Sequence, residues 1–462
     1  MILLKKAAAA CLFLQQLPGA VSLNVNFNDP NSVKSAASTV AFGMMKYYTG
    51  NNTGDTPGNL PDPYFWWEAG AMFGTMVDYW LLTGDATYNP VTTQALLHQV
   101  GDNKDYMPVN QTRTLGNDDQ GFWALAAMSA AESRYPDPPP GQPQWLALAQ
   151  AVFNEYTARW DMKTCGGGLR WQIFQFNNGF NYKNSISNGA FFNLAARLAR
   201  FTGNQTYAEW ANKIWDWERS TNLMTEKFEI YDGAVADGGQ DCKKPDMVQW
   251  TYNAGIFMHG AAFMYNLTES PKWKERVSGL LDRTMISFVQ NQVLVEPGCE
   301  FVGTCNNDQR SFKGYLTRWL GGTSQLAPFT FNTIQPILRN NAEAAAVACS
   351  GSPAAGFSGK PGTACGFRYK AGKDFDGMVG VGEQMNALNA LMYTLIRNNT
   401  KEVVPVTSDT GGTSKGDPTA GIIKAPEIGV FQPITTAGRV AAGFLTTGTI
   451  LSLVGACIFV VT

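Results

Sequence analysis

The chain has 462 residues, which corresponds to one large domain or two to three ordinary ones and allows a substantial core. It carries 35 Lys and Arg against 37 Asp and Glu, so its net charge of −2 argues against a nucleic-acid partner, which normally needs a clustered basic excess. With only two histidines, His98 and His259, a His-rich metal site and a Ser-His-Asp triad are excluded as leading hypotheses. Carboxylates and the abundant aromatic residues remain as the expected reagents, without a metal.

The first 22 residues have the features of a secretory signal peptide. Lys5 and Lys6 give a positive start, residues 7–17 are apolar, and Ala20-Val21-Ser22 supplies small residues for cleavage. The alternative is a buried N-terminal helix, but no cap or amphipathic pattern follows. We therefore expect residues 1–22 to be removed during export.

The body of the chain, residues 23–402, is predicted to be helical, because apolar residues recur at steps of three and four. One junction recurs as well: Leu82-Thr83-Gly84 with Tyr88, Phe201-Thr202-Gly203 with Tyr207, and Leu267-Thr268-Glu269 with Trp273. The spacing implies a helical hairpin of about 60 residues. Six such hairpins predict an all-α fold, an (α/α)6 toroid of twelve helices whose cleft is formed by loops at one end. An open solenoid or an irregular helical bundle is the alternative.

The pair Asp118-Asp119 follows Asn117 and runs into an Ala-rich predicted helix. Acidic residues in the first helical turn can act simply as caps that suit the helix dipole. However, neighbouring Cα atoms are 3.8 Å apart, so the two carboxyls can stand about 5 Å apart, as in retaining glycosidases. Two close carboxylates also separate their pKa values, so one can attack while the other donates a proton. The motif therefore predicts glycoside chemistry, with capping as the alternative.

Aromatic side chains stand beside Asn, Gly and Asp where several helices are predicted to begin. Flat aromatic faces bind the C–H faces of sugar rings, and Asn and Asp side chains bind the hydroxyls. Core packing is the alternative for any one Trp, and the tract 183–189 could equally be a helix cap. The clustering favours a carbohydrate-binding cleft, built from these segments: Tyr64-Phe65-Trp66-Trp67-Glu68, Trp123, Gly167-Gly168-Leu169-Arg170-Trp171 and Gln249-Trp250-Thr251-Tyr252-Asn253.

Cysteine usage agrees with export. Cys11 and Cys457 lie in the two end segments, and the six remaining cysteines form an even set, which implies disulfides. Spacing favours two short pairings and leaves one long one: Cys299–Cys305, Cys349–Cys365 and Cys165–Cys242. Five N-glycosylation sequons are expected at the surface: Asn51, Asn110, Asn204, Asn266 and Asn398.

The C-terminal end is apolar. No charged residue follows Arg439 in the segment 439–462, and residues 403–438 before it are rich in Thr, Gly, Pro and Ser. A cleaved N-terminal signal combined with such an end is typical of a GPI anchor, with a simple tail anchor as the alternative. The pattern predicts a flexible linker over 403–438 that contains the attachment residue. It also predicts a removed signal over 439–462 and a protein held at the outer face of the plasma membrane or in the cell wall.

Five motifs taken in order resemble glycoside hydrolase family 76, and more closely its GPI-anchored fungal cell-wall members. The resemblance covers about residues 24–400 and both end segments. It implies an (α/α)6 barrel that acts on α-1,6-linked mannose with retention. The motifs are Asn117-Asp118-Asp119, Gly167-Gly168-Leu169-Arg170-Trp171, Asn184-Ser185-Ile186-Ser187-Asn188-Gly189, Thr251-Tyr252-Asn253-Ala254-Gly255 and Ser311-Phe312-Lys313-Gly314-Tyr315-Leu316-Thr317-Arg318-Trp319.

By this resemblance, Asp118 matches the nucleophile and Asp119 the acid/base, and no cofactor is expected. The resemblance also implies a set of cleft residues that bind the substrate: Trp66, Trp67, Asn117, Trp123, Trp171, Asn184, Asn188, Asp232, Tyr252 and Asn253.

The resemblance and the two end segments together favour transfer over hydrolysis. The expected donor is an α-1,6-mannoside in the GPI-core glycan or mannan of a cell-wall protein, and the expected acceptor is wall β-glucan or another wall polysaccharide. An endo-α-1,6-mannanase that mainly hydrolyses, or a non-catalytic mannan-binding wall protein, is the alternative. An adhesin stalk would need a long, repetitive tract, whereas residues 403–438 are short and show no repeat.

Overall fold

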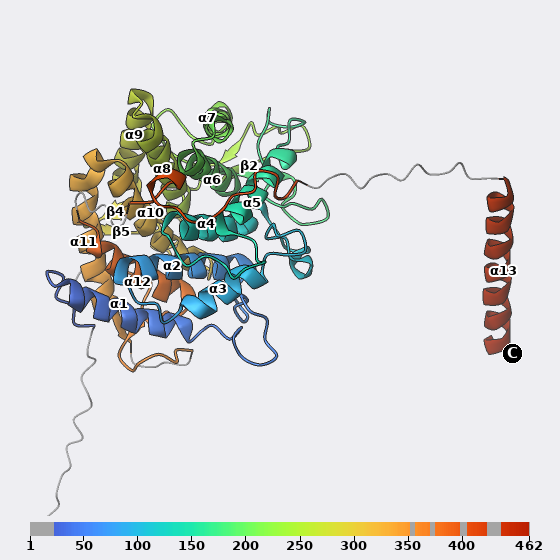
Figure 1. Ribbon diagram of the computed structural model, residues 1–462, viewed down its shortest axis with the longest axis horizontal. Helices are drawn as coiled ribbons and strands as arrows, with labels where there is room; N and C mark the ends of the chain where they lie inside the picture. Colours follow the sequence, from blue (N-terminus) through green and yellow to red (C-terminus); the bar gives the residue numbers. More distant parts are fainter. Residues whose placement is uncertain (1–22, 352–355, 370–374, 398–403, 423–435, 462) are drawn as a thin grey trace, which may run out of the picture. The chain divides into compact units, whose positions relative to one another are not determined.

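The computed structural model describes residues 23–351, 356–369, 375–397, 404–422 and 436–461 (Figure 1). The contacts divide the chain into two units, Met1–Gly421 and Ile422–Thr462, which are described separately below. The signal peptide, the sequon at Asn398, and residues 403 and 423–435 of the expected linker lie outside the described residues.

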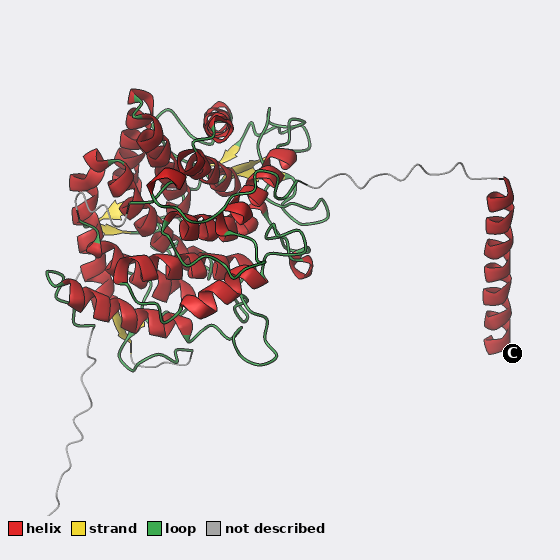
Figure 2. Ribbon diagram, viewed as in Figure 1, coloured by secondary structure: helices red, strands yellow, loops and turns green. Residues whose placement is uncertain are grey.

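Six helices form an inner ring in the first unit. Each contacts the next one, and α12 contacts α2, which closes the ring. The predominance of helix over strand is plain in Figure 2. The inner helices are α2 (Trp66–Thr83), α4 (Asn117–Glu132), α6 (Ser185–Thr202), α8 (Thr251–Thr268), α10 (Phe312–Leu326) and α12 (Val381–Met392).

Six further helices cover the ring from outside, and each packs on an inner helix. Five of them follow their partner directly in sequence, whereas α1 packs on α12, so the sixth pair joins the beginning and the end of the body. The predicted all-α (α/α)6 toroid is confirmed. The outer helices are α1 (Pro30–Met45), α3 (Asn89–His98), α5 (Trp145–Arg159), α7 (Gln205–Ser220), α9 (Pro271–Phe288) and α11 (Phe331–Ala348).

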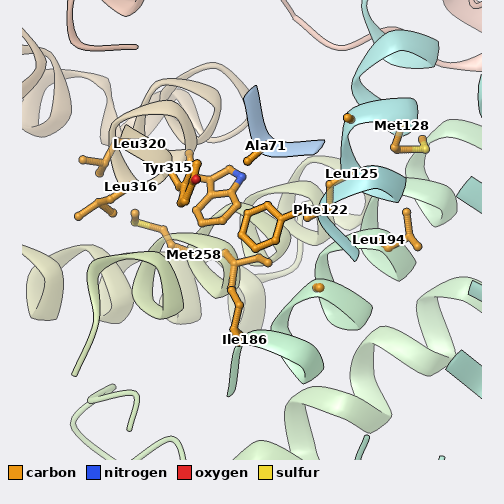
Figure 3. Packing of buried hydrophobic residues seen from close by; sticks show 14 of the residues in the cluster. Ala71, Phe122, Leu125, Met128, Ile186, Leu194, Met258, Tyr315, Leu316 and Leu320 are labelled. Atoms are coloured by element: carbon orange, nitrogen blue, oxygen red, sulfur yellow. The ribbon is translucent and has the colours of Figure 1, made fainter. Parts of the chain in front are cut away.

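The core lies between the inner helices, where large side chains from different helices meet (Figure 3). The rings of Phe122 on α4 and Tyr315 on α10 are 5.2 Å apart, and Ile186, Met258 and Leu316 are fully or almost fully buried. These residues are contributed by helices that are distant in sequence. Their burial gives the ring one continuous apolar interior.

The recurring junction ends three inner helices in the left-handed backbone conformation. Gly84 has φ 78° and Gly203 has φ 71°, whereas the third copy places Glu269 there with φ 50°. Only glycine adopts this conformation without a steric penalty. The shared junction confirms the predicted hairpin repeat and identifies Glu269 as its strained copy.

Short strands organise the loops outside the helices. β1 (Tyr182–Asn184), β2 (Gly233–Val235) and β3 (Pro245–Asp246) form an antiparallel sheet in which Asn184 pairs with Gly233 and Gly233 pairs with Asp246. Two further antiparallel pairs are β4 (Val289–Gln290) with β5 (Val293–Leu294) and β6 (Cys349–Gly351) with β7 (Ala364–Cys365). Short 3-10 turns complete the described elements: η1 (Val109–Gln111), η2 (Gln309–Ser311), η3 (Pro328–Thr330), η4 (Tyr393–Leu395) and η6 (Ser408–Thr410).

Three disulfides fasten the loops, with the pairing favoured by the sequence: Cys165–Cys242, Cys299–Cys305 and Cys349–Cys365. The longest joins residues 77 positions apart and ties the loop after α5 to the loop after β2. Among the described cysteines, Cys457 is free and exposed.

Residues 404–421, which their composition predicted to be flexible linker, instead belong to the first unit. We call this segment the strap. Val406 is buried and its amide donates to Glu132 O. The buried Ser414 Oγ accepts from Leu146 N, the second residue of α5, at 3.0 Å. Further along, Asn154 Nδ2 on α5 donates to Pro418 O at 2.9 Å. The ordered body therefore extends to Gly421 rather than to residue 402, because the strap meets polar partners along its length.

The sequons at Asn51, Asn110 and Asn204 lie in exposed positions, as expected for sites of N-glycosylation. Asn266 differs. Its Nδ2, the atom that a glycan would modify, donates to Leu326 O at 3.0 Å, and its Oδ1 accepts from Arg200 Nε at 2.7 Å. The expectation of a free surface site does not hold there, because the amide is engaged within the fold.

The second unit contains one described helix, α13 (Thr436–Val461). Its segment Val440–Ile458 is 19 residues long with a mean hydropathy of 1.7, so by length and composition it could cross a membrane. The helix coincides with the segment that the sequence assigns to a GPI signal or a tail anchor.

We predict that Glu269→Gly raises the free energy of unfolding by about 0.5–1 kcal/mol, because it relieves the left-handed strain at the end of α8. Denaturant unfolding measures the change. The matched control is Gly203→Glu in the equivalent junction, which should lower stability by a similar amount. Equal stability of the Glu269→Gly variant and the wild type would contradict the prediction.

We also predict that Ser414→Ala lowers the free energy of unfolding by about 1 kcal/mol, because the Leu146 amide in the first turn of α5 loses its buried partner. Ser35, exposed on α1, is the control position, where an alanine should cost nothing. Limited proteolysis provides a second measurement: the variant strap should be cut faster than the wild-type strap. Identical cutting rates would show that the strap does not depend on this hydrogen bond.

Candidate active site

A cleft of about 840 Å³ opens where the inner helices begin. Five of the six inner helices bring a residue from their start, or from the position just before it, to the cleft wall: Trp67 for α2, Asp118 for α4, Asn184 for α6, Tyr252 for α8 and Phe312 for α10. The inner helices run in one direction, so their positive dipole ends converge on this cleft. Such an end of a barrel favours carboxylates and other acceptor groups.

Asp118 and Asp119 lie side by side in the first turn of α4, and both line the cleft. Asp119 Oδ2 accepts from Gly116 N at 2.7 Å, and Asp118 Oδ1 accepts from Asp119 N at 3.1 Å. The capping role that the sequence left open is therefore real for Asp119. It occupies one carboxylate oxygen and leaves the other available to the cleft, so capping and chemistry do not exclude each other.

The pKa values of both aspartates are raised. Burial is the main cause for Asp118, and the neighbouring Asp119 adds to the increase. Burial raises the pKa of Asp119 to about 7, although the Gly116 amide opposes this and the Asp308 carboxylate adds to it. Because the two carboxyls lie side by side, a proton on one of them makes ionisation of the other less costly. One carboxylate and one carboxylic acid are the combination that a retaining glycosidase needs.

A backbone pairing fixes the position of the aspartate pair. Asn117 N donates to Trp171 O at 2.8 Å, Asn117 Nδ2 donates to Arg170 O at 2.8 Å, and Gly116 pairs with Gln172. The start of α4 is thus joined to the segment that carries Trp171, whose side chain lies close enough to Asp118 to lower the pKa of that carboxyl. The Trp171 side chain remains 37% exposed at the cleft, where a ligand can stack on it.

The opposite wall carries stacked aromatic rings. Tyr252 and Phe312 lie face to face with their centroids 3.8 Å apart, and both line the cleft. A buried polar network holds the positions beside them. Thr251 N donates to Glu296 Oε1 at 3.1 Å, and Lys313 Nζ donates to Glu300 Oε2 at 3.0 Å. The loop 296–300 therefore fastens the starts of α8 and α10 together, because Glu300 also accepts from Glu296 N.

Asp232 and Asn184 lie at the sheet side of the cleft. Asp232 Oδ2 accepts from Tyr182 Oη at 2.9 Å, and burial raises its pKa. Asn184 Oδ1 accepts from Ser187 N at 3.3 Å and so caps α6. Both side chains line the cleft. Asn184 therefore combines the two roles between which the sequence could not decide.

The structure places the residues that the sequence assigned to substrate binding in two groups. Six of them line the cleft together with the aspartate pair: Trp66, Trp67, Trp171, Asn184, Asp232 and Tyr252. Four are buried and do not line it: Asn117, Trp123, Asn188 and Asn253.

The four buried residues support the cleft from behind. Asn188 Oδ1 accepts from Leu169 N at 2.8 Å and its Nδ2 donates to Leu169 O at 3.0 Å, which fixes the segment leading to Trp171. Trp123 stacks on Trp66 at 5.2 Å. Asn117 and Asn253 are likewise buried at the starts of α4 and α8. The prediction that these four residues line the cleft is wrong, because position along the chain does not reveal which face of a helix turn is covered.

Two acidic cleft residues were missed: Asp246, which lies in β3, and Asp308, which precedes η2. Phe65, in a segment that the sequence assigned to the cleft, lines it and is 58% exposed. One signal could have identified Asp308: the polar tract Asn306-Asn307-Asp308-Gln309 stands before α10 as Asn117-Asp118-Asp119 stands at the start of α4.

The chain matches the family model for glycosyl hydrolase family 76 over residues 32–409. Among curated proteins it is similar to the mannan endo-1,6-alpha-mannosidase DCW1 of Saccharomyces cerevisiae. The two are 44% identical over 453 residues, which cover 97% of each chain.

Two solved structures are also similar. Dfg5 from Chaetomium thermophilum in complex with glucosamine shares 46% identity, with a TM-score of 0.80, over 86% of this chain and 97% of that one. An inactive variant of the α-1,6-mannanase GH76A of Salegentibacter sp. HEL1_6, in complex with α-1,6-mannotriose, shares the fold at 17% identity. Its TM-score is 0.59, over 79% of this chain and 99% of that one.

We predict that Asp119→Asn raises the melting temperature at pH 8, by about 2 °C or more, but not at pH 4. The folded protein holds the Asp119 proton up to about pH 7, whereas the unfolded chain releases it near pH 4. The stabilising effect of this proton is therefore complete below about pH 4 and is lost as the pH rises to about 7. The neutral amide keeps an acceptor for Gly116 N and has no proton to lose.

Thermal unfolding of both proteins across this pH range checks the prediction. Asp282→Asn, a charge removal at an exposed position of α9, is the control and should leave the profile unchanged. A parallel pH profile for wild type and Asp119→Asn would contradict the raised pKa.

Proposed function

The chain belongs to glycosyl hydrolase family 76, and we propose that it is a retaining enzyme that cleaves α-1,6-linked mannosides and transfers the glycan to a wall polysaccharide. It is a homologue of the fungal Dcw1 and Dfg5 mannan endo-1,6-α-mannosidases, and glycosidase activity on α-1,6-mannan is supported by that relationship. We further propose that the anomeric configuration is retained, that the glycan is transferred, and that the reaction serves the cell wall. The observation that carries it is the adjacent Asp118-Asp119 pair, held in one cleft with both pKa values raised.

In the proposed first step, the Asp118 carboxylate attacks the anomeric carbon while Asp119 protonates the glycosidic oxygen. The bond to the leaving sugar breaks and a covalent glycosyl–enzyme ester forms. Asp119, now ionised, removes a proton from the incoming hydroxyl, which attacks the same carbon and releases Asp118. The Trp171 side chain supports this assignment, because it lies close enough to Asp118 to lower the pKa of that carboxyl and so favours its ionised form.

The outcome depends on which hydroxyl enters second. Water gives hydrolysis, and a sugar hydroxyl gives transfer. The exposed rings of Phe65 and Trp171 and the stacked pair Tyr252–Phe312 support transfer, because they offer apolar faces on which an acceptor sugar can displace water. The proposed donor is the α-1,6-mannoside of a GPI-core or mannan glycan, and the proposed acceptor is β-glucan.

The end segments support a location at the cell surface. Residues 1–22 have the composition of a signal peptide, and α13 is apolar enough to cross a membrane or to serve as a removed GPI signal. The three disulfides fit an oxidising compartment. We propose that the mature protein is held at the outer face of the plasma membrane or in the wall.

We predict that Asp118→Asn lowers kcat on α-1,6-mannooligosaccharides by on the order of 10³-fold or more, because the nucleophile is lost. Asp119→Asn should be equally slow on natural substrates but partly restored on an α-1,6-mannobioside with a phenolic leaving group that needs no protonation. Asp282→Asn is the control and should act as wild type. Full activity of Asp118→Asn would overturn the enzyme proposal.

Product analysis of the wild type separates the remaining options. With α-1,6-mannooligosaccharides and β-glucan oligosaccharides supplied together, mass spectrometry should detect mixed products, and NMR should show the α-anomer first. Only shorter mannosides would indicate hydrolysis, and the β-anomer first would contradict retention.

A further inference from the structure

A third carboxylate, Asp308, lines the cleft in addition to the aspartate pair. It stands directly before η2 (Gln309–Ser311), which leads into α10. The Asp308 carbonyl accepts from Ser311 N at 2.9 Å and from Ser311 Oγ at 2.6 Å. These bonds fix the backbone of the turn, so the position of the Asp308 side chain in the cleft is set by the fold.

One oxygen of the Asp308 carboxylate is unpartnered. Oδ1 is buried and has no hydrogen-bond partner within the described part of the chain, although the Trp67 side chain lies close enough to lower the pKa of the group. The described residues also form no ion pair with it. A buried carboxylate oxygen without a donor is costly. In a cleft of this size, a ligand hydroxyl is the group that can relieve that cost.

Two observations place Asp308 near the reacting groups. Its negative charge acts on Asp119, where it raises the pKa, and on Tyr252 in the stacked wall. The neighbouring Trp67 packs against Phe122 at 4.7 Å, one turn along α4 from Asp118. Asp308 therefore faces the same space as the aspartate pair.

We propose that Asp308 is a substrate-binding residue, whose carboxylate accepts hydrogen bonds from hydroxyl groups of the neutral sugar held against Asp118 and Asp119. This inference rests on the proposed function and names a contact within it. A purely structural role would leave no carboxylate oxygen buried without a donor. The unpartnered Oδ1 is the reason to assign a ligand contact.

The test measures binding separately from turnover. On the Asp118→Asn background, isothermal titration with α-1,6-mannotriose gives a reference Kd, and adding Asp308→Asn should weaken it about 10-fold or more. The amide retains an oxygen for Trp67 but presents one acceptor fewer, so the melting temperature should change little. Asp282→Asn, the same charge removal on an exposed face, is the matched control and should leave the Kd unchanged.

A pH profile of the otherwise wild-type enzyme gives a second readout, which separates the charge of Asp308 from its contact with the sugar. Asp308→Asn removes a negative charge that acts on Asp119, so the alkaline limb of kcat/KM should move to lower pH. Asp308→Glu keeps the charge but displaces the oxygens, so it should weaken binding while leaving that limb close to its wild-type position.

The possible results separate the two proposals. If the Asp118→Asn reference binds mannotriose and both Asp308 variants bind it equally well, the role of Asp308 is overturned and the cleft remains the active site. If the reference does not bind and the wild type does not cleave, the proposed function itself fails. If Asp308→Asn is unfolded, Asp308→Glu decides by the same Kd criterion.

Discussion

Six helices that start at one end of a ring bring their unpaired backbone amides to the same place, and these amides need partners. The neighbouring elements supply several of them. Glu296 accepts from Thr251 N at the start of α8, Asn386 on α12 accepts from Gly314 N on α10 at 2.6 Å, and Tyr64 Oη accepts from Val381 N at the start of α12. Because each cap comes from another part of the chain, capping the helices also locks the ring.

The meeting of the helix starts at one end of the ring also determines where a pair of catalytic carboxylates can be held. The converging positive ends offset part of the cost of crowding carboxylates in a shielded cleft, while burial still keeps their pKa values high. Further along the inner helices, two arginines form largely buried ion pairs: Arg318 with Asp78, and Arg197 with Glu132. Within the described part of the chain, the pocket beside these pairs measures about 70 Å³ against about 840 Å³ for the cleft, so the end with the helix starts offers more room for a sugar chain.

The repeated Thr-Gly junction and the helical periodicity were enough to predict the toroid, because each hairpin is a local unit. The sequence also located Asp118 and Asp119, since adjacency in the chain guarantees adjacency in space. It could not distinguish Trp171, which lines the cleft, from Trp123, which is buried. Both tryptophans stand near Gly and Asn or Asp residues in the sequence, and this pattern does not show which ring is covered. The sequence did not identify Asp308, because this residue is distant from Asp118 and Asp119 along the chain. It comes close to them only when the helices assemble into the ring.

The composition of residues 403–438 suggested a free tether, yet the strap is fixed on the flank of α5 and α6 through residue 421. An extended chain spans at most about 3.5 Å per residue, so the 18 residues 404–421 would reach about 60 Å if they were free. Their fixation on the body removes that length from any segment that could link the body to an anchor.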